Sequence, residues 1–326
     1  MKRLDHYWYH KTLLTWALLP LAGLFYLLAA LRRWGYQTGF LAVRRIKPLV
    51  IVVGNITVGG SGKTPLVIWL VEFLTQKGFT PGIVSRGYRA KTDHFPQHVD
   101  SDSDPHKVGD EAVLLARRAG CPMVIDPNRV RAARVLAEKC DVIISDDGLQ
   151  HYALGRDIEI AVVDGMRRFG NGHHLPAGPL REPISRLGSV DMVVCNGGEV
   201  KQNEFRMELL PLGIYNLHTE SMIRTISDIQ GRLIHAVAGI GNPARFFNQL
   251  RELGLTLVEH AFPDHHDFKP TDLHFGDGEA IVMTEKDAVK CRYFAEPHYW
   301  YMPVKAKLED TFSNRLLHLL ERKVHG

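Results

Sequence analysis

Residues 47–64 read KPLVIVVGNITVGGSGKT. The first half is a short, β-branched run that ends in Gly and Asn, which predicts a buried strand. The second half is a glycine-rich turn that leads directly into a predicted helix over residues 65–78, with proline in its first turn and glycine near its end. A turn of this composition between a strand and a helix is typical of a phosphate-binding loop, the P-loop.

The residue types in this turn suit a nucleotide triphosphate. Glycines let backbone N–H groups point toward phosphate oxygens, and the helix N-terminus adds a favourable potential. Lys63 would reach the terminal phosphates and Thr64 would bind Mg²⁺, so ATP and Mg²⁺ are the expected cofactors. The predicted nucleotide-binding residues are Thr57, Val58, Gly59, Gly60, Ser61, Gly62, Lys63 and Thr64. In the usual spacing a glycine would stand where Thr57 is.

A second segment, DVIISDDGLQH over residues 141–151, carries two acids at the end of a predicted strand. This arrangement resembles a Walker B site, which holds the metal in nucleotide-binding enzymes. Thr64, Asp146 and Asp147 are therefore the predicted metal ligands. Adjacent acids after a strand also occur as a helix cap or a turn, and that alternative stays open on this segment alone.

Strand-like and helix-like segments alternate from residue 47 onward. Predicted strands lie at 81–85, 122–126, 141–147 and 158–165, with helices at 109–120 and 127–140 between them. A second series follows, with strands at 235–241, 255–262, 279–284 and 298–304 and a helix at 243–253. This alternation predicts an α/β fold, a P-loop-type parallel sheet with a smaller C-terminal α/β domain. The expected division is a membrane-associated helix and basic linker at 1–46, a P-loop domain at 47–215 and a C-terminal domain at 216–326.

Residues 166–190 are rich in Gly, Pro and Arg and show no clear period. A loop of this length inside a compact domain is usually functional. We therefore expect it to contribute to the site.

Residues 13–31, LLTWALLPLAGLFYLLAAL, contain no charge and are long enough to cross a membrane as a helix. Pro20 and Gly23 weaken a straight span, so a helix lying in the headgroup region is an alternative. A cleaved signal peptide is disfavoured by Arg32 and Arg33, which stand where small residues should precede a cleavage site. A buried soluble helix is the remaining alternative.

Charge is distributed unevenly along the chain. Residues 1–47 contain eight Lys or Arg and one acid, although the whole chain has a net charge of +4, so the remainder is net negative. This pattern favours an anionic membrane surface as a partner and not a nucleic acid, which would usually require a basic face on the body of the fold. More cations follow the apolar segment than precede it, which predicts a cytoplasmic body. The four cysteines form no C-x-x-C pair, consistent with a reducing compartment.

Eight motifs taken together resemble one enzyme family. They are GNITVGGSGKTP (54–65), SRGYRAK (85–91), GDE (109–111), DDGLQH (146–151), LPAGPLREP (175–183), AGIGNPARF (238–246), FPDHHDF (262–268) and TEKDAVK (284–290). They stand in the order expected of tetraacyldisaccharide 4'-kinases and extend over nearly the whole chain after the apolar segment. Eight collinear motifs are far more specific than any one of them.

The resemblance implies transfer of the ATP γ-phosphate to the 4'-hydroxyl of a tetraacylated glucosamine disaccharide 1-phosphate in lipid A biosynthesis. It also implies an active site in the cleft between the two domains. Asp110 matches the family's catalytic base and His265 its partner, and with Lys63 they form the predicted catalytic set. Asp146 and Asp147 match the metal-side carboxylates.

The chemistry of these residue types fits the implied roles. A sugar hydroxyl is a poor nucleophile, and an aligned carboxylate that accepts its proton lowers the barrier, while a bonded histidine can orient that carboxylate. Asp110 could alternatively cap the helix that follows it. His265 lies among Asp264, His266 and Asp267, so a metal site is an alternative there.

Polar residues in loops after strands, where open α/β sheets bind ligands, form the predicted substrate site. They are Arg86, Tyr88, Glu111, Arg129, Gln150, His151, Arg181 and Glu182, with Lys91 nearby in sequence. Arginine binds phosphate bidentately, which suits an acidic substrate and a triphosphate. Taken singly, each of these residues could instead be a polar group on the surface that contacts only water.

The expected partner is the acylated disaccharide 1-phosphate lipid. Removing its acyl chains wholly from a bilayer would cost roughly 0.8 kcal/mol per methylene, so the enzyme should act at the membrane surface. We expect a monomer on the cytoplasmic face of the inner membrane. The main alternative is a membrane-tethered P-loop NTPase that acts as a switch or a transporter component.

Overall fold

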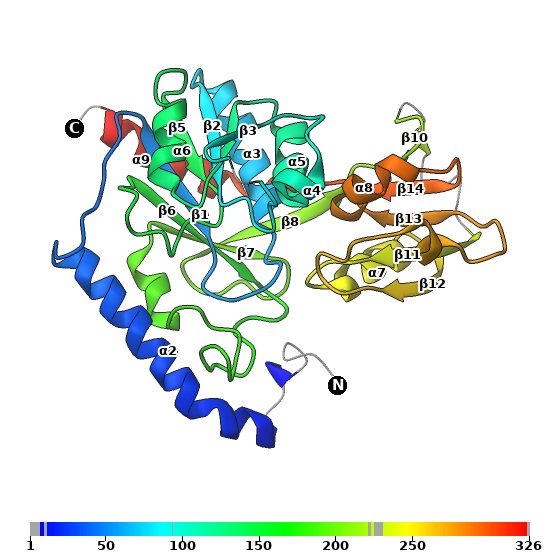
Figure 1. Ribbon diagram of the computed structural model, residues 1–326, viewed down its shortest axis with the longest axis horizontal. Helices are drawn as coiled ribbons and strands as arrows, with labels where there is room; N and C mark the ends of the chain where they lie inside the picture. Colours follow the sequence, from blue (N-terminus) through cyan, green and yellow to red (C-terminus); the bar gives the residue numbers. More distant parts are fainter. Residues whose placement is uncertain (1–6, 10–11, 93, 221–222, 225–230, 325–326) are drawn as a thin grey trace.

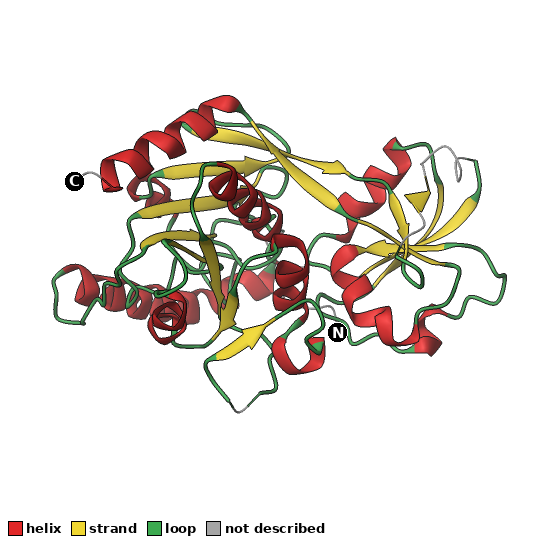
Figure 2. Ribbon diagram, turned by 90° about the horizontal axis from the view of Figure 1, so that it is seen from above, coloured by secondary structure: helices red, strands yellow, loops and turns green. Residues whose placement is uncertain are grey.

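The computed structural model describes residues 7–9, 12–92, 94–220, 223–224 and 231–324. Two β-sheets lie beside one another, and helices cover both of them (Figure 1, Figure 2). The long helix α2 (Leu13–Gln37) runs along one flank of the larger part. The predicted α/β fold with a smaller C-terminal sheet is confirmed.

The first sheet has the strand order β15-β8-β7-β6-β1-β5-β2-β4-β3. Its strands are β1 (Leu49–Gly54), β2 (Pro81–Ser85), β3 (Gln97–Val99), β4 (Met123–Ile125), β5 (Val142–Ser145), β6 (Ile158–Asp164), β7 (Met192–Asn196), β8 (Glu204–Pro211) and β15 (Val304–Leu308). Pairing is parallel from β8 to β4, and the two edge strands β15 and β3 are antiparallel. The predicted P-loop strand, β1, therefore lies in the centre of a parallel sheet.

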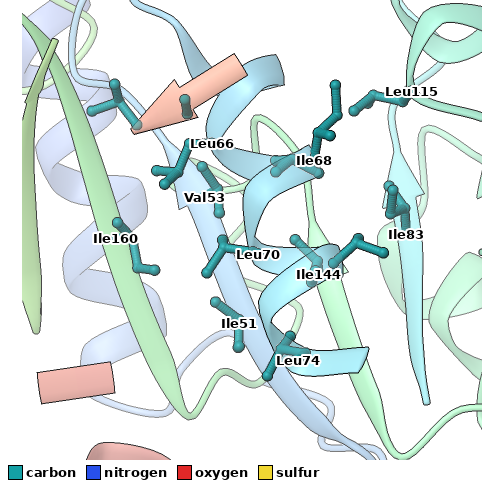
Figure 3. Packing of buried hydrophobic residues seen from close by; sticks show 14 of the residues in the cluster. Ile51, Val53, Leu66, Ile68, Leu70, Leu74, Ile83, Leu115, Ile144 and Ile160 are labelled. Atoms are coloured by element: carbon teal, nitrogen blue, oxygen red, sulfur yellow. The ribbon is translucent and has the colours of Figure 1, made fainter. Parts of the chain in front are cut away.

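Helices cover both faces of this sheet because its central strand is apolar on both sides. Ile51 and Val53 face one layer, formed by α3 (Lys63–Gln76), α5 (Asp110–Ala119) and α9 (Asp310–Val324). Val50 and Val52 face the other layer, which includes α6 (Arg129–Leu136). Successive side chains of a strand alternate between faces, so a sheet buried on both sides needs a continuous apolar run. Figure 3 shows Leu66, Leu70 and Leu74 of α3 packed over this strand.

The second sheet has the order β10-β9-β14-β13-β11-β12. Its strands are β9 (Ile214–Asn216), β10 (Ile223–Arg224), β11 (Leu233–Ala238), β12 (Thr256–Ala261), β13 (Ile281–Thr284) and β14 (Tyr299–Met302). On one face lies α7 (Pro243–Glu252), and on the other lies α8 (Glu285–Cys291). Shorter helical segments are α4 (Pro105–Val108), η1 (Ile184–Ser189), η3 (Pro270–Leu273) and η4 (Arg292–Phe294).

The C-terminal segment does not stay with the second sheet but returns to the first one. The single strand expected at 298–304 is two strands, and the second of them, β15, pairs with β8 of the first sheet. The following helix α9 buries Phe312 and Leu316 completely in the core beneath α3. Burial of each such side chain contributes roughly 1.5–3 kcal/mol, which explains why the chain returns to the first sheet.

Helix α2 is the one helix in the described part of the chain that is long and apolar enough to cross a membrane. Its most apolar window has a mean hydropathy of 2.0 and is 11% buried. The C-terminal half of the helix contacts the body, since the Tyr26 ring lies 4.8 Å from that of His174 and Arg33 donates to Ser189 Oγ at 3.0 Å. The loop at 166–190, predicted to be functional, therefore supports α2, and it contains η1 at its end.

Candidate active site

The P-loop is held by amide side chains from two strands. Asn55, which follows β1, donates to Gly59 O at 3.3 Å and to Ser61 Oγ at 3.2 Å. Asn196 at the end of β7 donates to Ser61 O at 3.0 Å. Gly62 precedes α3 with φ +95°, and a Cβ there would lie 2.2 Å from the amide nitrogen of Asn196. Glycine is therefore required at this position both for its backbone angle and for space.

Thr57, where the usual spacing has glycine, is in an extended segment. It forms an antiparallel bridge with Leu180, and the adjacent Val58 N–H donates to Pro179 O at 2.8 Å. Because this backbone has no positive φ, a residue with a side chain is tolerated. Pairing with the loop at 166–190 holds Thr57 extended, so the glycine of the usual motif is not needed at this position.

Asp146 and Asp147 follow β5 beside the P-loop but differ in environment. Asp147 is paired with Lys63 Nζ at 3.4 Å and with Arg181 Nη1 at 2.9 Å. Burial alone would raise the pKa of Asp147, but these two cations hold it well below its usual range. Asp146 accepts a hydrogen bond from Ser85 at 3.2 Å through Oδ2, while its Oδ1 is buried without a partner among the described residues.

The pKa of Asp146 is raised to about 7. Burial is the main cause, and the negative charges of Glu111 and Asp147 add to it against the opposing charges of Lys63 and Arg129. A buried carboxylate that lacks a cationic partner favours its neutral form. A bound cation would therefore stabilise the charged form of Asp146 more than that of Asp147.

Asp110 and His265 meet although 155 positions separate them. Asp110 opens α5 of the first sheet, and His265 lies in the loop after β12 of the second. His265 Nδ1 lies 3.0 and 3.1 Å from the two carboxylate oxygens of Asp110. Burial alone would raise the pKa of Asp110, but the hydrogen bond with His265 and the charges of Lys286 and Lys290 hold it well below its usual range.

Two lysines of α8 surround this pair. Lys286 Nζ lies 3.3 Å from His265 Nε2 and 2.8 Å from Glu111 Oε1. Lys290 Nζ lies 4.0 Å from Asp110 Oδ2. Neither lysine was predicted as a site residue, although both stand in the TEKDAVK motif (284–290). This motif, whose Thr284 caps α8, was the sequence feature that could have pointed to them.

A cavity of about 1090 Å³ connects the P-loop with Asp146, His265 and Lys286. It is bounded by the P-loop, by the loops after β12 and β13, and by one side of α2. The predicted residues that line it are Val58, Gly59, Gly60, Ser61, Gly62, Lys63, Thr64, Arg86, Tyr88, Glu111, Asp146, Asp147, Gln150, Arg181, Glu182 and His265. The sequence thus predicted the P-loop part of the cavity wall, but not the polar residues from α2 and from the second sheet, such as Arg33, Asn242 and Lys286.

Thr57, Asp110, Arg129 and His151 lie outside the cavity lining. Arg129 is buried, and burial lowers its pKa to about 10 although Asp146 and Asp147 act in the opposite direction. Burial and nearby arginines lower the pKa of His151 to about 4. Lys91 also lies outside the lining.

Glu182 is held in place by neighbouring polar groups. Its carboxylate accepts from Gln150 Nε2 at 2.7 Å and from the Tyr152 hydroxyl at 2.5 Å. Gln150 in turn donates to Asn55 O at 3.0 Å. The DDGLQH and LPAGPLREP motifs are therefore joined directly behind the P-loop.

Arg167 joins the P-loop to the second sheet and was missed by the sequence analysis. It donates to Gly60 O at 2.9 Å and to Gly241 O at 2.7 Å. A Cβ at Gly241 would lie 2.7 Å from Gly60 N, so the AGIGNP loop needs glycine to approach the P-loop. Arg167 lies in the irregular loop, where no local pattern marks it.

The alternative metal site around His265 is not supported. Among the described residues, no three His, Cys, Asp or Glu side chains are arranged to hold a metal. His266 instead pairs with Asp272 at 3.0 Å, while His265 faces Asp110.

Comparison with known proteins identifies the family. The sequence model of the LpxK family, tetraacyldisaccharide-1-P 4'-kinase, matches residues 14–321. This chain belongs to that family. The tetraacyldisaccharide 4'-kinase of Nitrosococcus oceani is 52% identical over 97% of this chain and 94% of its own length. That of Methylobacillus flagellatus is 48% identical over 98% and 96%.

A solved structure agrees with this placement. The crystal structure of LpxK from Aquifex aeolicus in complex with ATP is 29% identical and covers 95% of this chain and 99% of that one, with a TM-score of 0.78. The protein is therefore an ATP-dependent kinase of lipid A biosynthesis, a tetraacyldisaccharide 4'-kinase. The prediction from the eight motifs is confirmed, and nothing favours the NTPase switch or transporter component.

Proposed function

We propose that the cavity carries the 4'-kinase reaction with Asp110 as the proton acceptor and the P-loop as the triphosphate site. The observation that supports this most is the Asp110–His265 pair, because the two residues come from different parts of the fold and His265 lines the same cavity as the P-loop. Lys63 lies at the start of α3, where its ammonium can contact the transferred phosphate.

In this reaction the bond between the γ-phosphorus and its bridging oxygen breaks, and a bond from the 4'-oxygen forms. The hydroxyl proton passes to Asp110. Phosphoryl transfer has a loose transition state in which the proton leaves the nucleophile late, so a carboxylate of low pKa can act as the acceptor. The depressed pKa of Asp110 keeps it ionised and ready to accept that proton.

We propose that Mg²⁺ is bound by Asp146 and Thr64, with a lesser part for Asp147. Carboxylate and hydroxyl oxygens are the ligands that Mg²⁺ prefers, and the unpartnered, buried Oδ1 of Asp146 fits such a cation. Asp147 already pairs with Lys63 and Arg181. When bound, the ion neutralises charge on the phosphates and orients them for transfer.

The remaining polar wall would bind the sugar and its phosphate. Arg86, Tyr88 and Arg181 line the cavity from the first sheet, and Glu182 and Gln150 lie behind the P-loop. Arg129 and His151 support this wall from outside the lining. We also propose that the protein acts as a monomer.

We propose that α2 lies in the membrane interface on the cytoplasmic face of the inner membrane. Its contacts with the body extend from Tyr26 to Tyr36, whose ring lies 5.9 Å from that of Tyr152. A helix that touches the body over this length suits a position along the surface better than a span. The opposite side of α2 is exposed and apolar, with Leu24 and Leu31 more than half exposed.

The direct test is product formation. The full chain in mixed micelles should convert the tetraacylated disaccharide 1-phosphate and Mg-ATP to a product heavier by one phosphate, with the new phosphorus on the 4'-oxygen. Chelation of Mg²⁺ should abolish the product. ATP hydrolysis without this product, or phosphorylation at another position, would contradict the proposal.

A further inference from the structure

The ammonium of Lys286 has three acceptors around it. Nζ lies 2.8 Å from Glu111 Oε1, 3.2 Å from Asp264 Oδ1 and 3.3 Å from His265 Nε2. Its side chain is 15% exposed, so water replaces few of these contacts. The three N–H bonds of a lysine ammonium thus have one acceptor each.

The backbone that carries Lys286 is fixed on both sides. Thr284 caps α8 by accepting from Asp287 N at 3.2 Å. The buried Asp287 carboxylate accepts from Gly239 N at 2.8 Å and from Thr284 Oγ1 at 2.6 Å. Lys286 is therefore placed by the second sheet but reaches Glu111 of the first.

Lys286 is an ammonium ion in this setting. Burial alone would lower its pKa, but the carboxylates of Glu111, Asp264 and Asp110 raise it well above the usual range. An ammonium donates and cannot accept, so the facing nitrogen, His265 Nε2, must be unprotonated. The proton of the neutral ring then lies on Nδ1, where it can be donated to Asp110.

We propose that Lys286 is a positioning residue that fixes His265 as the neutral Nδ1–H tautomer. This inference rests on the proposed function and deepens it. Because Nδ1 already bears a proton and Nε2 is occupied by Lys286, His265 cannot take the proton that leaves the substrate. Asp110 is then the final acceptor within the site, and His265 only orients it.

The charges around the imidazole come from every element that packs on it. Asp110 contacts it from α5 and Lys286 from α8, and Asp264 Oδ1 of its own loop lies 3.8 Å from Nε2. Glu111 and Lys290 lie one contact further away, on Lys286 and Asp110. Tyr88 packs on the ring at 5.2 Å and the neighbouring Arg89 donates to His265 O at 2.7 Å. Of these charged side chains, Lys286 is the cation that contacts Nε2.

The tautomer can be measured by ¹⁵N NMR on histidine-labelled full-length protein, with His265 assigned by loss of its signals in His265→Gln. The wild type should show a protonated Nδ1 and an unprotonated Nε2. Lys286→Gln keeps an N–H donor toward Nε2 and should keep this pattern, whereas Lys286→Met should allow the ring to gain a proton on Nε2. A protonated Nε2 in the wild type, or an unchanged Lys286→Met spectrum, would overturn the proposal.

Kinetics give a second readout. In Lys286→Met an imidazolium can form and weaken Asp110 as a base, so kcat should fall more steeply toward acidic pH than in the wild type. The KM for ATP should stay within about twofold. The matched control is Lys305→Met, which removes an exposed lysine paired with Glu72 at 2.7 Å and should leave the pH profile unchanged.

Different results would contradict the proposed reaction and the proposed role of Lys286. A loss of ATP affinity in Lys286→Met that matches the loss of turnover would assign Lys286 to nucleotide binding and overturn its positioning role. The NMR experiment needs no substrate, so it decides the tautomer even where the phosphorylation assay gives no product. Thermal melting of Lys286→Met against the wild type excludes unfolding as the cause of any change.

Discussion

Asp146 lines the cavity and Asp110 lies just behind it, bonded to the lining residue His265, and their surroundings shift their pKa values in opposite directions. Asp110 contacts His265 and lies near two lysines, so its pKa is depressed and it stays ionised. Asp146 is buried near Glu111 and Asp147, so its pKa is raised to about 7. Two carboxylates with separated pKa values are suited to different roles, which agrees with one base and one metal ligand.

The half-buried imidazole of His151 should make the free energy of unfolding depend on pH. Its pKa in the folded chain is about 4, below the value of about 6.5 expected when unfolded. The unfolded chain therefore binds the proton first, so the contribution of His151 is present above about pH 6.5 and is lost as pH falls toward about 4. We expect His151→Gln to flatten the pH dependence of the urea midpoint in this window.

The control for this prediction is His318→Gln, which removes an exposed histidine on α9. It should leave the slope of urea midpoint against pH as in the wild type. An equal flattening in both variants would mean that burial of His151 is not the cause.

At the scale of elements, α2 combines two surfaces. One side contacts the loop at 166–190 and lines the cavity, whereas the other exposes Leu24 and Leu31. We expect Leu24→Glu with Leu31→Glu to abolish sedimentation with anionic vesicles, because both charges would enter the apolar interface. ATP affinity should be unchanged, since neither residue lines the cavity.

The matched control is Leu233→Glu, at an exposed leucine on β11 of the second sheet. This variant should bind vesicles like the wild type. Full vesicle binding by the double α2 variant would show that membrane attachment lies elsewhere in the chain.

Elements were predictable where the local sequence decides the outcome. The apolar run of β1 and the glycines before α3 fix a strand, a turn and a helix without help from distant residues. The return of β15 to the first sheet was not predictable, because Pro303 marks a break in residues 298–308 but nothing local shows that the two halves join different sheets. Pairing with β8 and burial of α9 determine where that run divides.

At the scale of the whole molecule, the site depends on side chains that the fold brings together. The family resemblance implied that Asp110 and His265 act as partners, and the fold brings their side chains within 3.0 Å. Lys286 and Arg167 were missed because lysine and arginine are common at surfaces. Their roles follow from the closeness of the two sheets, where Arg167 links Gly60 with Gly241.

If groups from both sheets form one catalytic centre, the loss of Asp110 should stop phosphate transfer without weakening ATP binding. Asp110→Asn should lower kcat for lipid phosphorylation by roughly 10²–10⁴-fold, since it removes the proton acceptor. The Kd for ATP should stay within about twofold, and Asp267→Asn, an exposed acid of the same FPDHHDF motif, should behave like the wild type. Asp110→Asn turnover above about a tenth of the wild type, or an equal loss of ATP affinity, would contradict the account.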